Sequence, residues 1–197
     1  ADDNEFTFYK NIKSIPAGHY AEITSDSFKI KKYWKLNYKL NLKFDKNEFD
    51  DLFNQNLRMH LNADVPIAFT LSGGLDSSSL IEYAIANKFQ VNAFSLLVSK
   101  QLGNDERTYI NSYLKKKEIN HNYIEANDND LKNVLEESIY YNDEPAGQAS
   151  KVLQFILRKK IGKKGYKVLI NGEGGDEVLA GYDRHYQNYL YENFLKN

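Results

Sequence analysis

The residues in this sequence best suited to chemistry are two aspartates set among glycines, Asp76 and Asp176. Asp76 lies in the stretch LSGGLDSSS at 71–79, and Asp176 lies in NGEGGDE at 171–177. Glycines let a ligand approach the main chain closely, and the free N–H groups at the start of a helix attract anions. An aspartate in such a turn would repel a phosphate unless a cation lay between them. Mg²⁺ bound by one or two carboxylates and by phosphate oxygens would resolve that conflict.

The stretch 71–79 fits a phosphate-binding turn between a strand and a helix. An apolar run at 65–70 precedes it, and apolar residues at helical spacing follow it at 80–86. Ser77 and Ser78 are predicted to cap the helix. The turn is not a Walker A loop, because no Gly-Lys-Ser/Thr follows the glycines. For Asp76 two interpretations stay open here, a magnesium ligand or a helix cap.

The stretch 171–177 repeats this design, since an apolar run at 167–170 leads into glycines, acidic residues and an expected helix. Ligands of open parallel sheets bind beyond the carboxyl ends of the strands. If the first and last strands are neighbours, Asp76 and Asp176 face one cleft from two loops. Two carboxylates surrounded by glycine amides suit a magnesium–polyphosphate group.

Alternating patterns predict the elements that hold these loops. Strands are expected at 65–70, 91–98, 121–124 and 167–170, and helices at 45–61, 80–86, 104–117, 130–141 and 149–161. Strands that alternate with helices indicate an α/β fold, a parallel sheet with helices on both faces. The helix at 45–61 is expected to bury a stripe formed by Phe49, Leu52, Phe53, Leu57 and Leu61.

A short β-rich segment precedes this domain. Residues 20–23 and 28–34 are predicted to form a hairpin around a turn at 24–27. A hairpin of this size has little core of its own.

Composition excludes several classes of protein. The 197 residues carry a formal net charge of -1 and no cysteine, so there is no basic footprint for nucleic acid and no disulfide or thiolate chemistry within the chain. The start, ADDNEFTFYK, is no signal peptide, and no apolar stretch approaches the ~18 residues of a membrane helix. The prediction is a cytoplasmic protein that binds neither nucleic acid nor a membrane.

The hexapeptide SGGLDS at 72–77 resembles the pyrophosphate-binding loop of the ATP-pyrophosphatase (PP-loop) superfamily, and so implies a PP-loop or HUP-like fold. The segment GEGGDE at 172–177, followed by Gly181-Tyr182, is similar to the synthetase domain of glutamine-dependent asparagine synthetases. Supporting pieces follow in order: IPAGH at 15–19, YW at 33–34, DVP at 64–66, DER at 105–107 and DEP at 143–145.

The resemblance implies ATP-dependent amide synthesis. A carboxylate, in asparagine synthetases the side chain of aspartate, is adenylated with release of pyrophosphate, and ammonia then displaces AMP. Glu173 matches a glutamate that serves adenylate formation, so it is the expected catalytic residue. The implied ATP-binding residues are Leu71, Ser72, Gly73, Gly74, Asp76, Ser77, Leu96, Asn171 and Gly172. The implied magnesium ligands are Asp76 and Asp176, while the roles of Arg107 and Asp143 stay open between an ion pair and catalysis.

The same resemblance predicts three parts. Residues 1–34 are similar to the tail of a glutaminase domain, 35–61 form a connection and a helix, and 62–197 match the N-terminal part of a synthetase domain. Glutaminase domains of the family begin with a nucleophilic cysteine and this chain begins with Ala1, so we expect a fragment that lacks the glutaminase domain.

The expected partners are ATP, an aspartate-like carboxylate and ammonia from glutamine, with a homodimer as a candidate assembly. Two alternatives remain open at this point. One is an amidotransferase for another carboxylate, on a sugar or an antibiotic precursor, and the other is a non-catalytic nucleotide-binding relative.

Overall fold

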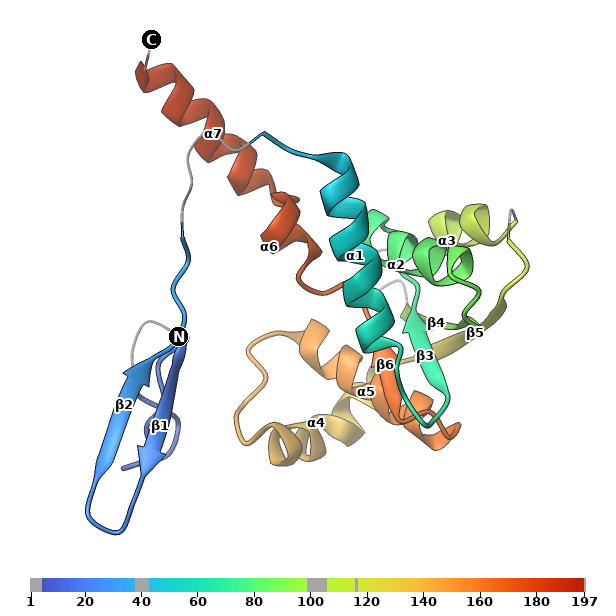
Figure 1. Ribbon diagram of the computed structural model, residues 1–197. Helices are drawn as coiled ribbons and strands as arrows, with labels where there is room; N and C mark the ends of the chain where they lie inside the picture. Colours follow the sequence, from blue (N-terminus) through green and yellow to red (C-terminus); the bar gives the residue numbers. More distant parts are fainter. Residues whose placement is uncertain (1–4, 38–42, 99–105, 116, 197) are drawn as a thin grey trace. The chain divides into compact units, whose positions relative to one another are not determined.

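The chain forms two compact units, Ala1–Asp45 and Lys46–Asn197. A computed structural model describes residues 5–37, 43–98, 106–115 and 117–196. The first unit is a small β structure, and the second carries both glycine-rich loops (Figure 1).

The first unit is built on the predicted hairpin. Strands β1 (His19–Ile23) and β2 (Phe28–Lys32) are antiparallel, with His19 opposite Lys32. Gly18 precedes β1 with φ +71°, and a Cβ there would lie 2.6 Å from the carbonyl oxygen of Trp34. A larger residue would therefore force the two chain segments apart.

The second unit is organised around a parallel sheet with strand order β5-β4-β3-β6 (Figure 1). Its strands are β3 (Ile67–Thr70), β4 (Asn92–Val98), β5 (Asn120–Ala126) and β6 (Val168–Ile170). β3 pairs in parallel with both β4 and β6. β3 and β6, the first and last strands of this sheet along the chain, are therefore neighbours, as a cleft between the two loops requires.

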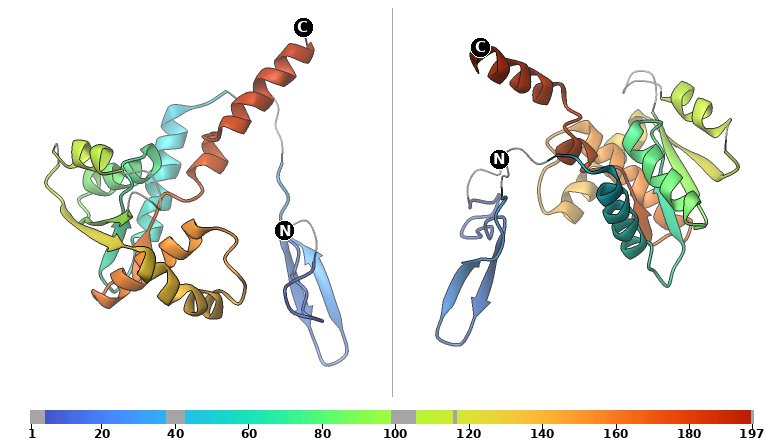
Figure 2. Two further views of the ribbon diagram at one scale, coloured as in Figure 1. Left: turned by 180° about the vertical axis from the view of Figure 1, so that it is seen from behind. Right: turned by 45° about the horizontal axis from the view of Figure 1, so that its top comes forward.

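Successive side chains of each strand point to opposite faces of the sheet. Ala68 and Phe94 pack on one face against Leu157 of α5 (Ala149–Lys163). Phe69 and Ala93 pack on the other face, in a cluster with buried residues of three helices. These helices are α1 (Lys46–His60), α2 (Leu75–Ala86) and α3 (Arg107–Leu114). The predicted α/β fold with helices on both faces is confirmed (Figure 2).

Two details of the helices differ from the predictions. Leu52, assigned to the buried stripe of α1, is 58% exposed. Leu52 lies five residues before the buried Leu57, and this spacing turns its side chain about 140° away from Leu57 around the helix. Phe53 lies one turn from Leu57, on the same face, and packs on Tyr83. Helix α3 ends at Leu114 and not near Lys117, while its predicted start at 104 lies outside the described residues.

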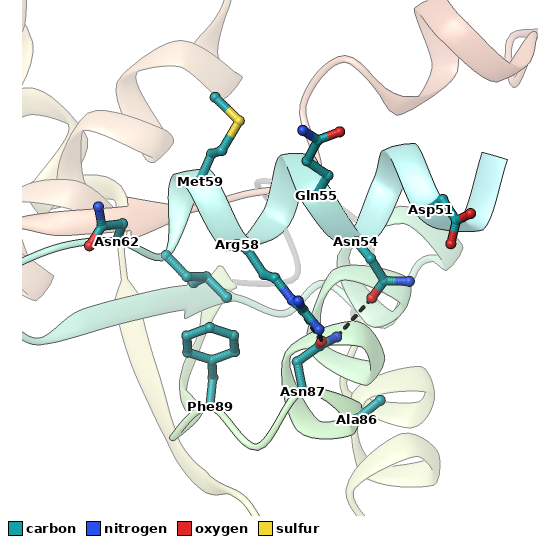
Figure 3. Close-up of a pocket in the computed structure, with 10 residues that line it drawn as sticks. Asp51, Asn54, Gln55, Arg58, Met59, Asn62, Ala86, Asn87 and Phe89 are labelled. Carbon is teal, nitrogen blue, oxygen red and sulfur yellow. Dashed lines mark hydrogen bonds between the residues drawn. The ribbon is translucent and has the colours of Figure 1, made fainter. Parts of the chain in front are cut away.

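Helix α1 is held against the end of α2 by amide side chains (Figure 3). The Nε and Nη2 atoms of Arg58 donate to Oδ1 of Asn87 at 3.1 and 2.8 Å. Nδ2 of Asn87 donates in turn to Oδ1 of Asn54 at 2.8 Å. These groups line a cavity of about 880 Å³, and because they hydrogen-bond one another, their evident role is to fix the two helices.

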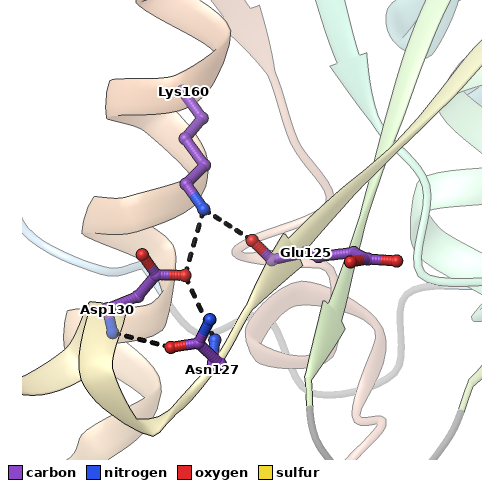
Figure 4. A network of polar contacts seen from close by, with 4 residues as sticks. All are labelled: Glu125, Asn127, Asp130 and Lys160. Atoms are coloured by element: carbon purple, nitrogen blue, oxygen red, sulfur yellow. Dashed lines mark hydrogen bonds and ion pairs between the residues drawn. The ribbon is translucent and has the colours of Figure 1, made fainter.

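Helix α4 (Asp128–Asn142) begins with a capping box that also binds α5 (Figure 4). Oδ1 of Asn127 accepts from the amide of Asp130 at 3.0 Å, and Oδ2 of Asp130 accepts from the amide of Asn127 at 3.2 Å. Nζ of Lys160 donates to the same Asp130 oxygen and to the carbonyl oxygen of Glu125. The Lys160 ammonium, together with the Asn127 amide, lowers the pKa of Asp130. One lysine therefore links α5 to β5 and α4.

After β6 the chain forms the short helix α6 (Gly175–Leu179) and then α7 (Asp183–Lys196). Large side chains of α7, among them Tyr189 and Phe194, are exposed. Across the described ranges, no helix has the length and apolar character needed to cross a membrane.

Candidate functional site

The first glycine loop follows β3 directly and ends where α2 begins. Gly74 is the N-cap of α2, with ψ 166° and no side-chain cap hydrogen bond. The prediction that Ser77 and Ser78 cap this helix is therefore wrong, and Asp76 does not cap it either. The reason lies in the turn, where the hydroxyl of the buried Ser77 donates to the carbonyl of Gly74 and accepts from the amide of Ser72, both at 3.3 Å. Because no side chain caps the start of α2, its first N–H groups can still donate hydrogen bonds to an anion.

The second glycine loop packs directly on the first. A Cβ on Gly172 would lie 2.9 Å from the amide nitrogen of Ser77, and a Cβ on Gly175 would lie 2.5 Å from Oδ2 of Asp76. Only a residue without a side chain allows the loops to approach this closely. The pairing of β3 with β6 brings the two loops to the same edge of the sheet.

The two loops line one cavity of about 1060 Å³. The predicted site residues that it brings together are Leu71, Ser72, Gly74, Asp76, Ser77, Leu96, Asn171, Gly172, Glu173 and Asp176. Gly73 is absent from this lining. It has φ +80°, and a Cβ there would lie 2.7 Å from Cβ of Tyr109, so its close contact is with α3.

The two carboxylates fit a magnesium ion that arrives with a polyphosphate. Asp76 and Asp176 both line the cavity. Among the residues that the structure describes, no group of three or more histidine, cysteine, aspartate or glutamate side chains forms a metal site. Mg²⁺ needs no such group, because it keeps several waters and is often held by one or two carboxylates and by substrate phosphates.

Glu173 is held at the cavity wall by two donors. Nη2 of Arg158 lies 3.2 Å from Oε2 of Glu173, and Nδ2 of Asn171 lies 2.9 Å from the same oxygen. Both carboxylate and guanidinium are about half exposed, at 55% and 52%. Both donors converge on one carboxylate oxygen, so they fix the direction of the Glu173 side chain.

Sequence reasoning missed two residues of α5 at this site, Gln154 and Arg158. Both line the cavity, and Nη2 of Arg158 also donates to Oε1 of Gln154 at 3.1 Å. The signal that could have found them is their spacing of four residues, which puts two polar side chains on one face of a helix that otherwise buries apolar residues.

Glu106 also lines the cavity, together with the carboxylates of Asp76, Glu173, Asp176 and Glu177. Burial raises the pKa of the Glu106 carboxyl group. Its predicted companion Asp105 lies outside the described residues, and Arg107 is the first residue of α3.

A smaller cavity of about 440 Å³ adjoins this site and shares Gln154, Arg158 and Glu173 with it. Glu144 and Pro145, from the supporting motif DEP at 143–145, line it. Asp143 itself is the C-cap of α4, with φ 56° in the left-handed region. Aspartate is among the residues that tolerate this conformation, so its position indicates a backbone role.

Fold and site together define the class: an α/β protein whose candidate site lies at the carboxyl ends of parallel strands. A family model described as asparagine synthase matches residues 48–196. The chain belongs to the asparagine synthase family.

Among its relatives is the amidase chyE of Penicillium rubens, 25% identical over 199 residues that cover 90% of this chain and 30% of the relative. The glutamine-hydrolyzing asparagine synthetase 2 of Bacillus subtilis is 28% identical over 89% of this chain and 26% of the relative. The chain thus spans less than a third of the length of these curated relatives. The solved U34-tRNA thiolase NcsA of Methanococcus maripaludis is 17% identical, with a TM-score of 0.46 over 68% of this chain and 48% of that chain.

Proposed function

We propose that this chain carries the ATP-binding part of an enzyme that converts a carboxylate to an amide through an acyl-adenylate. The carboxylate of the leading proposal is the aspartate side chain and the product is asparagine, with ammonia supplied from glutamine. The observation that carries the proposal is the direct contact of the two glycine loops, which puts Asp76 and Asp176 on one cavity.

In the proposed first step a carboxylate oxygen attacks the α-phosphorus of ATP. A new oxygen–phosphorus bond forms, and the bond from the α-phosphorus to the bridging oxygen breaks, so negative charge grows on the leaving pyrophosphate. The uncapped start of α2 is suited to stabilise that charge. The Ser72 hydroxyl, which lies 3.0 Å from the Ser77 hydroxyl in the free chain, can turn to donate to a phosphate oxygen. Asp76 and Asp176 would hold Mg²⁺, whose positive charge would further stabilise the leaving group.

Domain roles follow from this assignment. Residues 62–197 would form the nucleotide-binding part of a synthetase domain, 35–61 a connection with α1, and 1–34 the tail of a glutaminase-like domain. A homodimer and a cytoplasmic location, where ATP is abundant, belong to the same proposal.

The acceptor would occupy the space beside Glu173. Arg158 and Gln154 line both cavities there, so a carboxylate in the smaller cavity could reach the α-phosphorus of a nucleotide in the larger one. The Arg158 guanidinium is suited to attract the acceptor carboxylate, and Glu173 is the proposed catalytic residue for adenylate formation.

A second candidate keeps the adenylating chemistry and changes the acceptor to another carboxylate, on a sugar or an antibiotic precursor. Two relatives named as amidases, from Penicillium rubens and Gibberella zeae, favour it.

An ATP–pyrophosphate exchange assay on the full gene product, screened with amino acids and other carboxylates, tests the proposal. Exchange that depends on aspartate would support asparagine synthesis, and exchange with another carboxylate would select the second candidate. Binding of MgATP without exchange for any acceptor would point to a non-catalytic nucleotide-binding relative and contradict the proposal.

A further inference from the structure

A buried serine lies directly behind the first glycine loop. Ser95 sits in the middle of β4 and is 1% exposed. Its hydroxyl oxygen lies 2.5 Å from the carbonyl oxygen of Leu71, the residue that joins β3 to the glycine loop. The same hydroxyl lies 2.8 Å from Nε2 of His121 on the neighbouring strand β5. Three adjacent strands are thus connected at the point where the candidate site begins.

The direction of these two hydrogen bonds follows from chemistry. A carbonyl oxygen only accepts, so the single proton of the Ser95 hydroxyl must point to Leu71. The Ser95 oxygen can then only accept from His121, which must carry a proton on Nε2. Burial lowers the pKa of His121 and favours the neutral ring, and the contact with Ser95 selects its Nε2–H tautomer.

The bond from Ser95 completes the attachment of Leu71 to β4. The amide of Leu71 donates to the carbonyl of Phe94 at 2.9 Å, and its carbonyl accepts from Ser95. Both polar backbone groups of Leu71 are therefore bound to β4. The next residue is Ser72, whose amide and hydroxyl bond to Ser77 inside the loop. The orientation of the Leu71–Ser72 peptide thus sets the direction in which the loop leaves the sheet.

We propose that Ser95 is a positioning residue of the nucleotide site. Its hydroxyl, directed by His121, fixes the Leu71 carbonyl and through it the course of the glycine loop at 72–77. The effect on MgATP binding rests on the proposed function. The effect on the order of the loop is expected in the ligand-free protein as well. Loss of the hydroxyl leaves the buried Leu71 carbonyl and the partly buried His121 donor without their partner, so the peptide before the loop is free to turn.

The chain offers a matched control in Ser138. It is also 1% exposed, and its hydroxyl donates to the carbonyl of Leu135 at 2.8 Å, within α4 and outside the residues that line the cavity. Ser95→Ala and Ser138→Ala therefore remove the same group from equally buried sites. A purely structural role for Ser95 predicts that the two variants behave alike.

The experiment measures MgATP affinity by calorimetry and amide hydrogen exchange of 72–77 in the ligand-free chain. Ser95→Ala is expected to weaken MgATP binding about three- to tenfold, the loss typical of one hydrogen bond, and to accelerate exchange in the loop. Ser138→Ala is expected to change neither. His121→Leu should give smaller changes in the same direction, because the Ser95 hydroxyl keeps its bond to Leu71 but loses the donor that directs it. His121→Gln should lie closer to wild type because its amide can donate, and ¹⁵N spectra should show the Nε2–H tautomer.

Equal loop exchange in wild type, Ser95→Ala and His121→Leu would overturn the inference, as would a neutral Nδ1–H tautomer of His121. If Ser95→Ala does not fold, the two His121 variants give the same comparison. Failure of the wild-type chain to bind MgATP would count against the proposed function, whereas loop exchange would still decide the role of Ser95.

Discussion

The carboxylate of Asp76 packs against the α-carbon of Gly175, so that a Cβ on Gly175 would lie 2.5 Å from Oδ2 of Asp76. This contact joins the start of α2 to the start of α6. It explains why two loops about a hundred residues apart line one cavity. A side chain at Gly175 or at Gly172 would push the second loop away from Asp76.

Replacement of Gly175 by alanine is expected to displace the Asp76 carboxylate. Because a short side chain can rotate away, we expect a loss of stability of about 1 kcal/mol, at the low end for overpacking, and a clear loss of MgATP affinity. Gly147→Ala is the control, since a Cβ there meets nothing within 4 Å. Unfolding in urea and MgATP titration measure the two effects, and equal affinity of both variants would contradict the role of this contact.

Replacement of Gly172 by alanine should be more damaging to the fold. Its Cβ would meet the backbone amide of Ser77 at 2.9 Å, and a helix backbone cannot rotate away as a side chain can. We expect about 1–3 kcal/mol of destabilisation, seen as a lower urea midpoint with an unchanged slope. A variant as stable as wild type would show that the loops are not in this contact.

Arg158→Ala removes the cation beside Glu173. The pair is half exposed, so its loss should change the free energy of unfolding by less than about 1 kcal/mol. Adenylate formation in the full gene product should fall by a larger factor, about tenfold or more, because Glu173 and the acceptor lose their positively charged neighbour. Pyrophosphate release measures this effect, and a fall no greater than that of Lys163→Ala, on the same helix and outside both cavities, would argue against it.

The free energy of unfolding is expected to depend on pH through Glu106. Burial raises the pKa of its carboxyl group in the folded state, so the folded protein holds the proton more tightly than the unfolded chain. The stability associated with that proton is complete below the unfolded pKa and is lost as the pH rises through the folded pKa. Glu106→Gln should therefore be more stable than wild type at pH 8, and the difference should shrink toward pH 4. Urea unfolding at both pH values checks this, and a difference independent of pH would contradict it.

Asn127→Ala should weaken the start of α4. It removes the cap that accepts from the amide of Asp130, which typically costs about 1 kcal/mol. Asn127→Ser keeps an N-cap oxygen and should recover most of the loss. Thermal unfolding separates the two variants, and equal melting temperatures would show that the capping box contributes little.

Much of this architecture was predictable because the patterns are local. The apolar runs before Leu71 and Asn171 predicted β3 and β6, and the glycines with their aspartates predicted the loops. The neighbouring position of these strands was a hypothesis from the rule for parallel sheets, and the pairing of Ile67 with Val168 bears it out.

The rest depends on contacts between residues far apart in the sequence. Arg158 was overlooked because a basic residue on a helix resembles a solvated surface residue until Glu173 is placed beside it. Ser95 and His121 were overlooked because a serine inside an apolar strand has no local signal. The capping error at Ser77 arose because its hydroxyl turns back toward Gly74, which only the folded loop defines.

The central claim is that Asp76 and Asp176 together hold Mg²⁺ with the phosphates of ATP. Calorimetric titration of ATP into wild type, Asp76→Asn and Asp176→Asn, with Mg²⁺ and with EDTA, tests it most directly. We predict that wild type binds ATP at least about tenfold more tightly with Mg²⁺ and that each substitution removes most of this gain. An equal gain from Mg²⁺ in all three proteins would contradict the account.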